Sequence, residues 1–271
     1  MAHIEQGKSG VGISFDETKL VLLDILNDFN RFCRVNGLRY SIAYGSLIGV
    51  VRHHGFIPWD DDIDILIPRR DYMRFLNEYQ HPYYKLFSQE TDSEWPLNFA
   101  KLCDTRTVSV DSFGNTSSIA IDMFILDGLP GPFERAKKFV VKVNRLHSIW
   151  SSQLFTRRLD VGRRFGIKKN CLILLSKLAH CFIPYNLFVA EMLKYKQQYD
   201  LESSMYCASL TGDCRIYETE KMLDYTYAPF EDTEVMICKN YDYQLKLTHG
   251  DYMTLPPEDQ RYNHEAIAYW K

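Results

Sequence analysis

Several common sequence features are missing from this chain of 271 residues, and each absence excludes a class of protein. A membrane-spanning helix needs about 20 consecutive apolar residues, but the most apolar tract, 171–193, is interrupted by charged residues and a proline. The first 12 residues also lack the apolar core of a secretory signal peptide. We therefore expect a protein that is made and kept in the cytosol.

Paired cysteines and a net positive charge are missing as well. The seven cysteines are widely spaced and form no C-x-x-C motif, which gives weak support to a zinc site and predicts reduced, mostly buried thiols. Cys207 and Cys214 are the one pair that merits a test for metal. The formal net charge of -3 argues against a general nucleic-acid-binding protein.

The residues that are present predict a folded protein with an uneven charge. Hydrophobic residues make up 46% of the chain and charged residues 25%, which suffices for a buried core. Between Glu134 and Lys196 there are 14 Lys and Arg against three acids, while the rest of the chain has 18 basic and 32 acidic residues. We therefore predict a single catalytic domain over residues 1–271 that contains a basic, mainly helical inserted subdomain at 132–200.

Outside this segment, helix and strand patterns alternate along the first 130 residues. Ser14 and Glu17 form a capping-box pattern ahead of an apolar stripe, which predicts a helix from Ser14 to Asn36. Strands are predicted at 39–44, 62–67, 99–103, 107–110 and 119–126, and further helices at 70–79, 137–150 and 170–199. This order favours an α/β (α+β) fold with a mixed sheet flanked by helices.

Three aspartates interrupt apolar strand patterns. The two-residue period of a strand places Asp62 and Asp64 on one face, with Cα atoms about 7 Å apart, and Asp122 stands alone in a second apolar strand. An unpaired carboxylate in such a place is costly unless a cation uses it, and Mg²⁺ prefers oxygen ligands. We predict that Asp62, Asp64 and Asp122 are catalytic and hold metal, most simply two Mg²⁺ ions, with Mn²⁺ as the alternative.

A glycine-serine turn before these acids points to phosphate chemistry. Gly45 and Ser46 end one predicted strand and begin a short helix, whose free N–H groups attract anions. Arg52, about two turns further on, can reach the same phosphate. Taken alone, an acidic run such as 60–62 is usually a solvated loop and Gly-Ser is usually a turn. Together they suit phosphoryl transfer, in which catalysis is mostly positioning and charge neutralisation.

A long stretch of the chain resembles the LicD family of phosphocholine transferases, within the nucleotidyltransferase-fold superfamily. The resemblance rests on AYGSLIGVVRHHGFIPWDDDID at 43–64, PRRDY at 68–72, FAKL at 99–102, IDMF at 121–124, HGDYM at 249–253 and PPE at 256–258, followed by Arg261 and His264. The family usually has Tyr-Gly before the acid at 251, so His249 is a departure. The resemblance covers residues 15–130 and 225–265 and leaves the basic middle uncovered.

The resemblance implies a donor, a product and a set of binding residues. The donor would be a CDP-activated alcohol, typically CDP-choline, and the product a phosphocholine-decorated glycan such as teichoic acid or lipopolysaccharide, with release of CMP. We predict that the residues that bind the donor are Gly45, Ser46, Arg52, Arg69, Lys101, Arg261 and His264. For Arg261 and His264, a salt bridge that anchors the C-terminus is an equal alternative. Trp59, Trp95 and Tyr252 are candidates for holding the quaternary ammonium of choline.

Three other functions stay open at this point. Within the wider group, the donor alcohol could be ribitol, glycerol or ethanolamine phosphate. Nucleotide transfer from an NTP would release pyrophosphate in place of CMP. A non-catalytic adaptor that binds a membrane or polymer is the alternative from another class, and the intact set of glycine, serine and aspartates argues against it.

The basic segment 134–196 also predicts where the protein works. Its cations alternate with apolar and aromatic side chains, which is typical of helices that lie in a membrane interface. We expect peripheral binding to anionic lipid at the inner face of the cell membrane, where a lipid-linked or polymeric glycan acceptor would be presented, and no nucleic-acid partner. The alternative is a structural subdomain whose basic faces pack on an acidic core.

Overall fold

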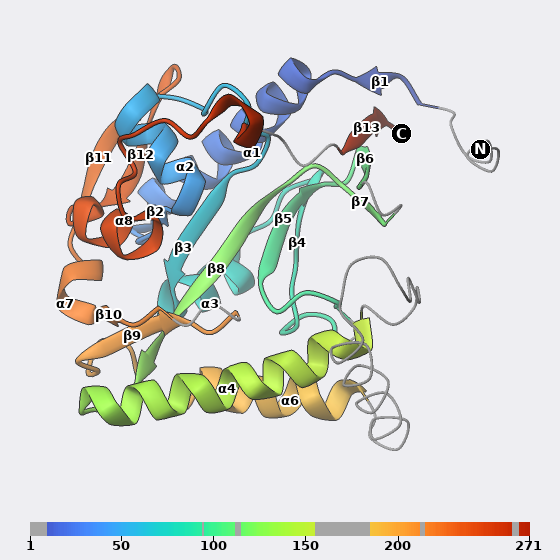
Figure 1. The fold of residues 1–271 in the computed structure, drawn as a ribbon. Coiled ribbons are helices and arrows are strands. Elements are labelled where there is room, and N and C mark those ends of the chain that lie inside the picture. Colours follow the sequence, from blue (N-terminus) through green and yellow to red (C-terminus); the bar gives the residue numbers. More distant parts are fainter. Residues whose placement is uncertain (1–9, 94, 112–114, 155–184, 212–214, 262–265) are drawn as a thin grey trace. The chain divides into compact units, whose positions relative to one another are not determined.

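The computed structural model describes the chain except residues 1–9, 94, 112–114, 155–184, 212–214 and 262–265 (Figure 1). The chain forms two compact units. The first unit comprises Met1–Phe87, Ala100–Phe124 and Lys221–Lys271, and the second comprises Ser88–Phe99 and Ile125–Glu220. Within the described residues, no helix combines the length and the apolar composition needed to cross a membrane.

Helix α1, Phe15–Asn36, begins and ends as its sequence predicts. The Ser14 hydroxyl accepts a hydrogen bond from the backbone N–H of Glu17, and the Glu17 carboxylate accepts one from the N–H of Ser14. Gly37 ends the helix in the left-handed region, at φ 64°, where a glycine has no steric cost. The apolar stripe, which includes Leu22, Ile25 and Phe29, is fully buried.

The central sheet of the first unit has the strand order β2-β3-β8-β5-β4. Its strands are β2 Ser41–Ile42, β3 Asp64–Pro68, β4 Tyr84–Phe87, β5 Ala100–Asp104 and β8 Ala120–Leu129. The pairs β2–β3, β5–β8 and β4–β5 are antiparallel, whereas β3 and β8 run in the same direction (Figure 1). The sheet is therefore mixed, as predicted.

Two strand boundaries differ from the prediction at the place where the aspartates lie. The predicted strand at 39–44 shrinks to two residues, because Tyr44 already begins helix α2, Tyr44–Ile48. The predicted strand at 62–67 begins only at Asp64, so Asp62 lies in the preceding loop and the two acids do not share a strand. The inference of a common strand face for Asp62 and Asp64 was therefore wrong.

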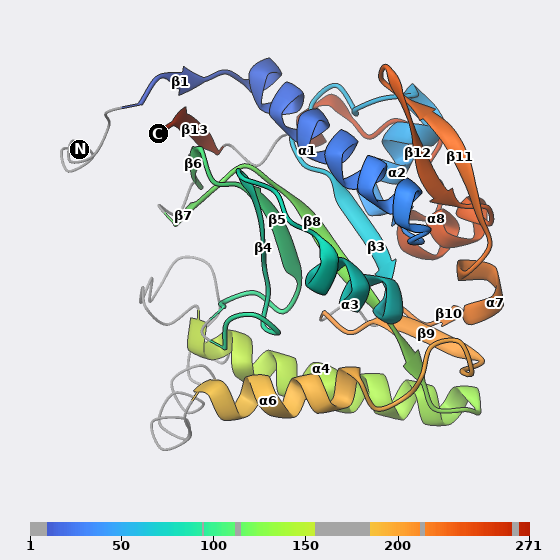
Figure 2. The ribbon, with the colours of Figure 1, turned by 180° about the vertical axis from the view of Figure 1, so that it is seen from behind.

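Short helices and a hairpin complete the first unit. Helix α2 continues directly into a turn of π-helix, Gly49–His53, and α3 spans Arg69–Glu78. The C-terminal part contains α7 Thr219–Met222 at the unit boundary, the hairpin β11 Tyr225–Phe230 and β12 Thr233–Cys238, helix α8 Tyr241–His249 and a 3-10 turn at Glu258–Gln260. Helix α8 packs on α2, as Figure 2 also shows.

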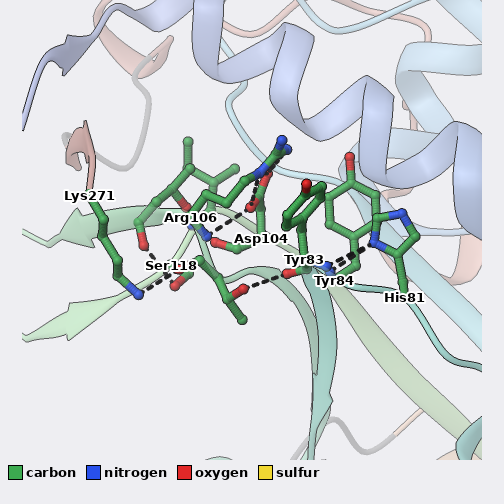
Figure 3. Close-up of polar contacts among 10 residues, drawn as sticks. His81, Tyr83, Tyr84, Asp104, Arg106, Ser118 and Lys271 are labelled. Atoms are coloured by element: carbon green, nitrogen blue, oxygen red, sulfur yellow. Dashed lines mark hydrogen bonds and ion pairs between the residues drawn. The ribbon is translucent and has the colours of Figure 1, made fainter.

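The two ends of the described chain meet in a small antiparallel sheet. β1 Gly12–Ile13 and β6 Thr107–Val110 both pair with β13 Ile267–Trp270, and β7 Thr116–Ser117 pairs with β6. Beside it, Arg106 forms an ion pair with the fully buried Asp104 and lies over the Tyr83 ring, while the Lys271 ammonium donates to the carbonyl of Thr105 (Figure 3). These contacts fasten the C-terminus to the turn between β5 and β6.

The second unit contains two helices and a small sheet. Helices α4 Phe133–Leu154 and α6 Tyr185–Lys196 pack side by side, and the end of β8 pairs with β9 Tyr206–Ser209, which pairs with β10 Tyr217–Glu218. Of the predicted helix at 170–199, the half at 170–184 lies outside the described residues, and α6 falls in the other half. The described cysteines at 33, 103, 207 and 238 are buried thiols outside disulfides, as predicted, while Cys214 lies outside the described residues.

Candidate active site

The glycine-serine turn is fastened to the start of strand β3. The Asp64 N–H donates to the Ser46 hydroxyl oxygen at 2.9 Å, and the Asp64 carbonyl accepts from the Ala43 N–H at 2.9 Å. A Cβ added to Gly45 would lie 3.3 Å from an Asp60 carboxylate oxygen, so glycine leaves space beside that acid. The structure therefore places the turn and the acidic segment in contact.

Strand β8 positions the third aspartate, Asp122, beside the glycine-serine turn and the acidic segment. The Asp122 N–H donates to the Ile63 carbonyl at 2.8 Å, which sets Asp122 beside the Asp62–Asp64 segment. On its other side β8 pairs with β5 in a register that puts Lys101 opposite Asp122. The Lys101 ammonium lies 2.7 Å from an Asp122 carboxylate oxygen, and the two side chains are 23% and 17% exposed.

The electrostatics of this cluster centre on Asp64. Its pKa is raised well above the ordinary value, first by burial and then by the negative charges of Asp62, Asp122 and Asp60, against which Lys101 acts in the opposite direction. Burial by itself would lower the pKa of Lys101, but the charge of Asp122 and the hydrogen bond to it raise that pKa overall. The four carboxylates thus form a site with an excess of negative charge.

This excess is what a divalent cation would neutralise, and carboxylate oxygens are the donors that Mg²⁺ prefers. Among the described residues, however, no three acidic, imidazole or thiol side chains are already arranged around a common point as metal ligands. The carboxylate oxygens are suitable ligands for Mg²⁺, while the side chains of Asp62, Asp64 and Asp122 would need to turn toward a bound ion. The metal assignment stays a prediction.

The segment that contains these residues is similar to a known domain. Residues 37–152 match the family model described as the LicD/FKTN/FKRP nucleotidyltransferase domain, a span that contains the turn, the aspartates and Lys101. Residues 37–152 therefore resemble a LicD nucleotidyltransferase domain. The chain is 29% identical over 267 residues to the lipopolysaccharide cholinephosphotransferase LicD of Haemophilus influenzae, covering 95% of this chain and 98% of the relative.

Two further relatives match only a short segment of the chain. Uncharacterised proteins of Rickettsia typhi and Rickettsia prowazekii are 38% and 42% identical over 60 and 52 residues, respectively. The matches cover 22% and 19% of this chain and about a fifth of each relative, 19% and 20%. They support a shared local segment and carry no information on the rest of the chain.

The remaining predicted site residues fall into separate groups. Arg52 lies in the π-helix Gly49–His53 and donates to the carbonyl oxygen of Tyr252 at 2.8 Å, which joins the N-terminal motif to the C-terminal block. Arg69, the first residue of α3, lies over the Tyr72 ring at 5.7 Å. Arg261 donates to the carbonyl of Pro256. His264 lies outside the described residues, so neither alternative for the Arg261–His264 pair is tested.

The aromatic candidates for choline are partly engaged in other contacts. The Tyr252 hydroxyl donates to Asp242 at 2.9 Å, and the indole N–H of Trp95 donates to the carbonyl of Phe99. Trp59 has the Arg261 guanidinium over its ring at 5.1 Å and the His53 ring at its edge. His53 was missed as a site residue from the sequence. The signal that could have found it is its place directly after Arg52 in the long LicD motif.

Proposed function

We propose that the protein transfers phosphocholine from CDP-choline to a sugar hydroxyl of a cell-surface glycan precursor and releases CMP. The LicD domain and the likeness to a cholinephosphotransferase over 95% of the chain support a phosphotransferase. The observation that carries the proposal is the convergence of Asp62, Asp64, Asp122 and Lys101 beside the Gly45–Ser46 turn. This convergence also favours an enzyme over a non-catalytic adaptor, because such a charge excess is costly without a catalytic use.

The roles of the residues follow from these contacts. Ser46 fixes the start of β3 and hence Asp64, while Asp62, Asp64 and Asp122 would hold Mg²⁺ or Mn²⁺, which when bound supplies charge neutralisation for the donor phosphates. Lys101 holds Asp122 in place and favours its charged form, in which a carboxylate can accept the acceptor hydroxyl's proton. Gly45 leaves room for a phosphate close to the backbone.

The acceptor and the alcohol of the donor are the finer parts of the proposal. A lipopolysaccharide acceptor is what the name of the Haemophilus relative suggests, and a teichoic-acid precursor is the second candidate. Donors that carry ribitol, glycerol or ethanolamine phosphate remain the alternative, because the carboxylate centre would act on the donor phosphates and would not distinguish the alcohols. Release of pyrophosphate from an NTP would identify a nucleotide transferase in place of a phosphocholine transferase.

A donor panel tests this proposal. Purified protein with Mg²⁺ is incubated with CDP-choline, CDP-ethanolamine, CDP-ribitol or CDP-glycerol, and slow hydrolysis to CMP is measured. We expect CDP-choline to turn over fastest, and Asp64→Asn to reduce turnover at least about a hundredfold, as loss of a main electrostatic group does. The matched control is Asp24→Asn, on the exposed face of α1. Near-native turnover by Asp64→Asn would refute the site, and faster turnover of CDP-ribitol would refute the donor.

We further propose that the second unit binds anionic membranes or anionic polymer through its basic helix face. On α4, the exposed basic residues are Arg135, Lys137, Lys138, Lys142 and Arg145, of which 135, 138, 142 and 145 recur at helical spacing. Exposed Phe133 and Val141 accompany them. Each Lys or Arg near an anionic leaflet contributes about 1 kcal/mol of attraction.

Flotation with liposomes tests this part separately. The protein should float with vesicles that contain anionic lipid at low salt and should remain in solution with neutral vesicles or at high salt. Replacing Arg135, Lys138 and Lys142 by Gln should abolish flotation, whereas the same change at three exposed cations of the first unit should not. Protein that stays in solution with anionic vesicles at low salt would leave α4 a structural element.

A further inference from the structure

Arg52 carries a positive charge that has no carboxylate partner in the described part of the chain. Its Nε donates to the His53 Nε2 at 2.9 Å, and its Nη1 donates to the backbone oxygens of Tyr252 at 2.8 Å and of Thr254 at 3.5 Å. These contacts hold the guanidinium in one orientation without neutralising it. An oriented, partly buried and uncompensated cation is what an anion-binding site requires.

Arg261 brings a second guanidinium to the same place. It lies 5.1 Å from the centre of the Trp59 ring, and the Trp59 ring lies 6.5 Å from the His53 ring. The carboxylate of Glu258 lies 4.0 Å from Arg261, but the Glu258 side chain is 91% exposed, so this ion pair is weak. Arg52, His53, Trp59 and Arg261 thus form a connected set, which we term the Arg52–Arg261 cluster.

The charges of the cluster agree with this geometry. The pKa of Arg52 is lowered, first by burial and then by the like charge of Arg261. In the folded protein the two cations therefore repel each other across a partly buried region. A bound anion between them would relieve that repulsion, which gives the cluster an intrinsic preference for a ligand with at least one negative charge.

His53 adds a hydrogen-bond donor, the N–H of its Nδ1 atom. A guanidinium can only donate, so the His53 Nε2 that receives the Arg52 hydrogen bond must be the acceptor nitrogen. The proton of the neutral ring then sits on Nδ1, and burial together with the charge of Arg52 lowers the pKa of His53, which keeps the ring neutral. Its Nδ1–H is available to a phosphate oxygen.

We propose that the Arg52–Arg261 cluster binds the phosphate of the nucleotide half of the donor, and that Trp59 and His53 hold the two arginines for this task. The inference rests on the proposed function, because it takes the donor to be a diphosphate. The carboxylate centre with Lys101 would then face the phosphorus that is transferred, and the cluster, which has cations without buried acids, would face the phosphate that leaves.

The chemistry of the step explains why cations are placed at the leaving side. The acceptor oxygen forms a bond to the phosphorus of phosphocholine, and the bond from that phosphorus to the bridging oxygen breaks. The electron pair stays on the bridging oxygen, so the departing CMP gains one negative charge, while the acceptor's proton passes to Asp122 or to solvent. Two guanidinium groups oriented at that phosphate stabilise the charge that develops on it.

Binding of CMP without metal tests the cluster independently of turnover. CMP is titrated into the protein in the presence of EDTA, and the Kd is measured by calorimetry. We expect Arg52→Met and Arg261→Met each to weaken CMP binding about tenfold or more, because a charge-assisted hydrogen bond contributes about 1.5–3 kcal/mol. The exposed Arg31→Met of α1 is the matched control and should bind CMP as the unmodified protein does.

Variants of the supporting residues show whether the cluster acts as one unit. Trp59→Ala should weaken CMP binding in the same direction as Arg261→Met, and the double variant should lose less than the product of the two effects, because both act through one guanidinium. Thermal unfolding of each variant shows that the fold is retained. CMP binding within twofold of the unmodified protein in both Arg52→Met and Arg261→Met would overturn the inference.

The same assay separates the failure of this inference from that of the proposed function. The exposed Asp24→Asn of α1 should bind CMP in EDTA and turn over the donor as the unmodified protein does. Loss of CMP binding in the arginine variants supports the cluster even where CDP-choline is not the donor. Turnover of CDP-choline together with unchanged CMP binding in the arginine variants would keep the function and reject the cluster.

Discussion

At the scale of single residues, the site depends on how Asp122 is compensated. Lys101 is the cation that the register of β5 and β8 places against this carboxylate, at 2.7 Å. The same ammonium also opposes the upward pKa shift of Asp64. Lys101 therefore reduces the repulsion among several acids. It affects both the stability of the fold and the protonation of the carboxylates in the site.

We predict that the Lys101–Asp122 pair is strongly coupled. Lys101→Met should lower the free energy of unfolding by about 2–3 kcal/mol, because it leaves a partly buried carboxylate without its cation. The double variant Lys101→Met/Asp122→Asn should recover about 1–2 kcal/mol of that loss. Urea unfolding of the two single variants and the double variant measures the coupling, and strictly additive effects would show that the pair contributes nothing.

At the scale of elements, the turn from α2 into the π-helix sets the positions of Ser46 and Arg52. A Cβ at Gly49 would lie 2.5 Å from the backbone oxygen of Gly55, which cannot move without displacing the loop that leads to Trp59. Only glycine allows this close approach of two backbone segments. The π-helical turn, a feature often found at functional sites, is thus stabilised by a tight contact in the core.

We predict that Gly49→Ala destabilises the protein and impairs the site. The free energy of unfolding should fall by about 1–3 kcal/mol, as it does for overpacked positions, and donor turnover should fall because Ser46 and Arg52 shift. Gly12→Ala is the control, since a Cβ there meets nothing within 4 Å. Equal stability of the two alanine variants would contradict the assigned contact.

Helix α1 offers a second prediction at this scale. Ser14→Ala removes the side chain that accepts from the Glu17 N–H and should cost about 1 kcal/mol of stability. Ser14→Asp keeps an acceptor at the N-cap and should cost little. Thermal unfolding of both variants checks this, and an Ala variant as stable as the Asp variant would show that the capping box does not contribute.

At the scale of the whole molecule, the response to pH depends on a histidine of the second unit. Burial, together with the charge of Lys196, lowers the pKa of His147 to about 4. In the unfolded chain a histidine titrates near 6.5. Between pH 6.5 and pH 4 the unfolded chain binds a proton at this histidine, whereas the folded protein does not. The contribution of the neutral His147 to the free energy of unfolding is therefore complete above pH 6.5 and is lost as the pH falls toward 4.

We predict that His147→Gln flattens the acid side of the stability curve. The free energy of unfolding of the unmodified protein should decrease as the pH falls from about 6.5 to about 4, and the decrease should be smaller in the variant. The exposed His249→Gln serves as the control and should follow the unmodified protein. Identical pH dependence for His147→Gln and the unmodified protein would refute the assignment.

The sequence by itself determined the features that depend on neighbours along the chain. The capping box and apolar stripe of α1 are contacts between residues three or four positions apart, so their pattern predicts the helix directly. The polar aspartates in apolar surroundings indicated the acidic centre for a similar reason, because an isolated carboxylate in a strand pattern is conspicuous. The long LicD motif added the class of fold and chemistry.

Tertiary structure decided what depends on pairing between distant segments. The start of β3 at Asp64 is set by the hydrogen bonds to the turn at 43–46, and not by local preference, so Asp62 falls outside the strand. The Lys101–Asp122 pair follows from strand register, and the contact of Arg52 with Tyr252 joins residues 200 positions apart. Such contacts form only when the free energy of packing and strand pairing exceeds the entropy cost of closing long loops, which no local pattern encodes.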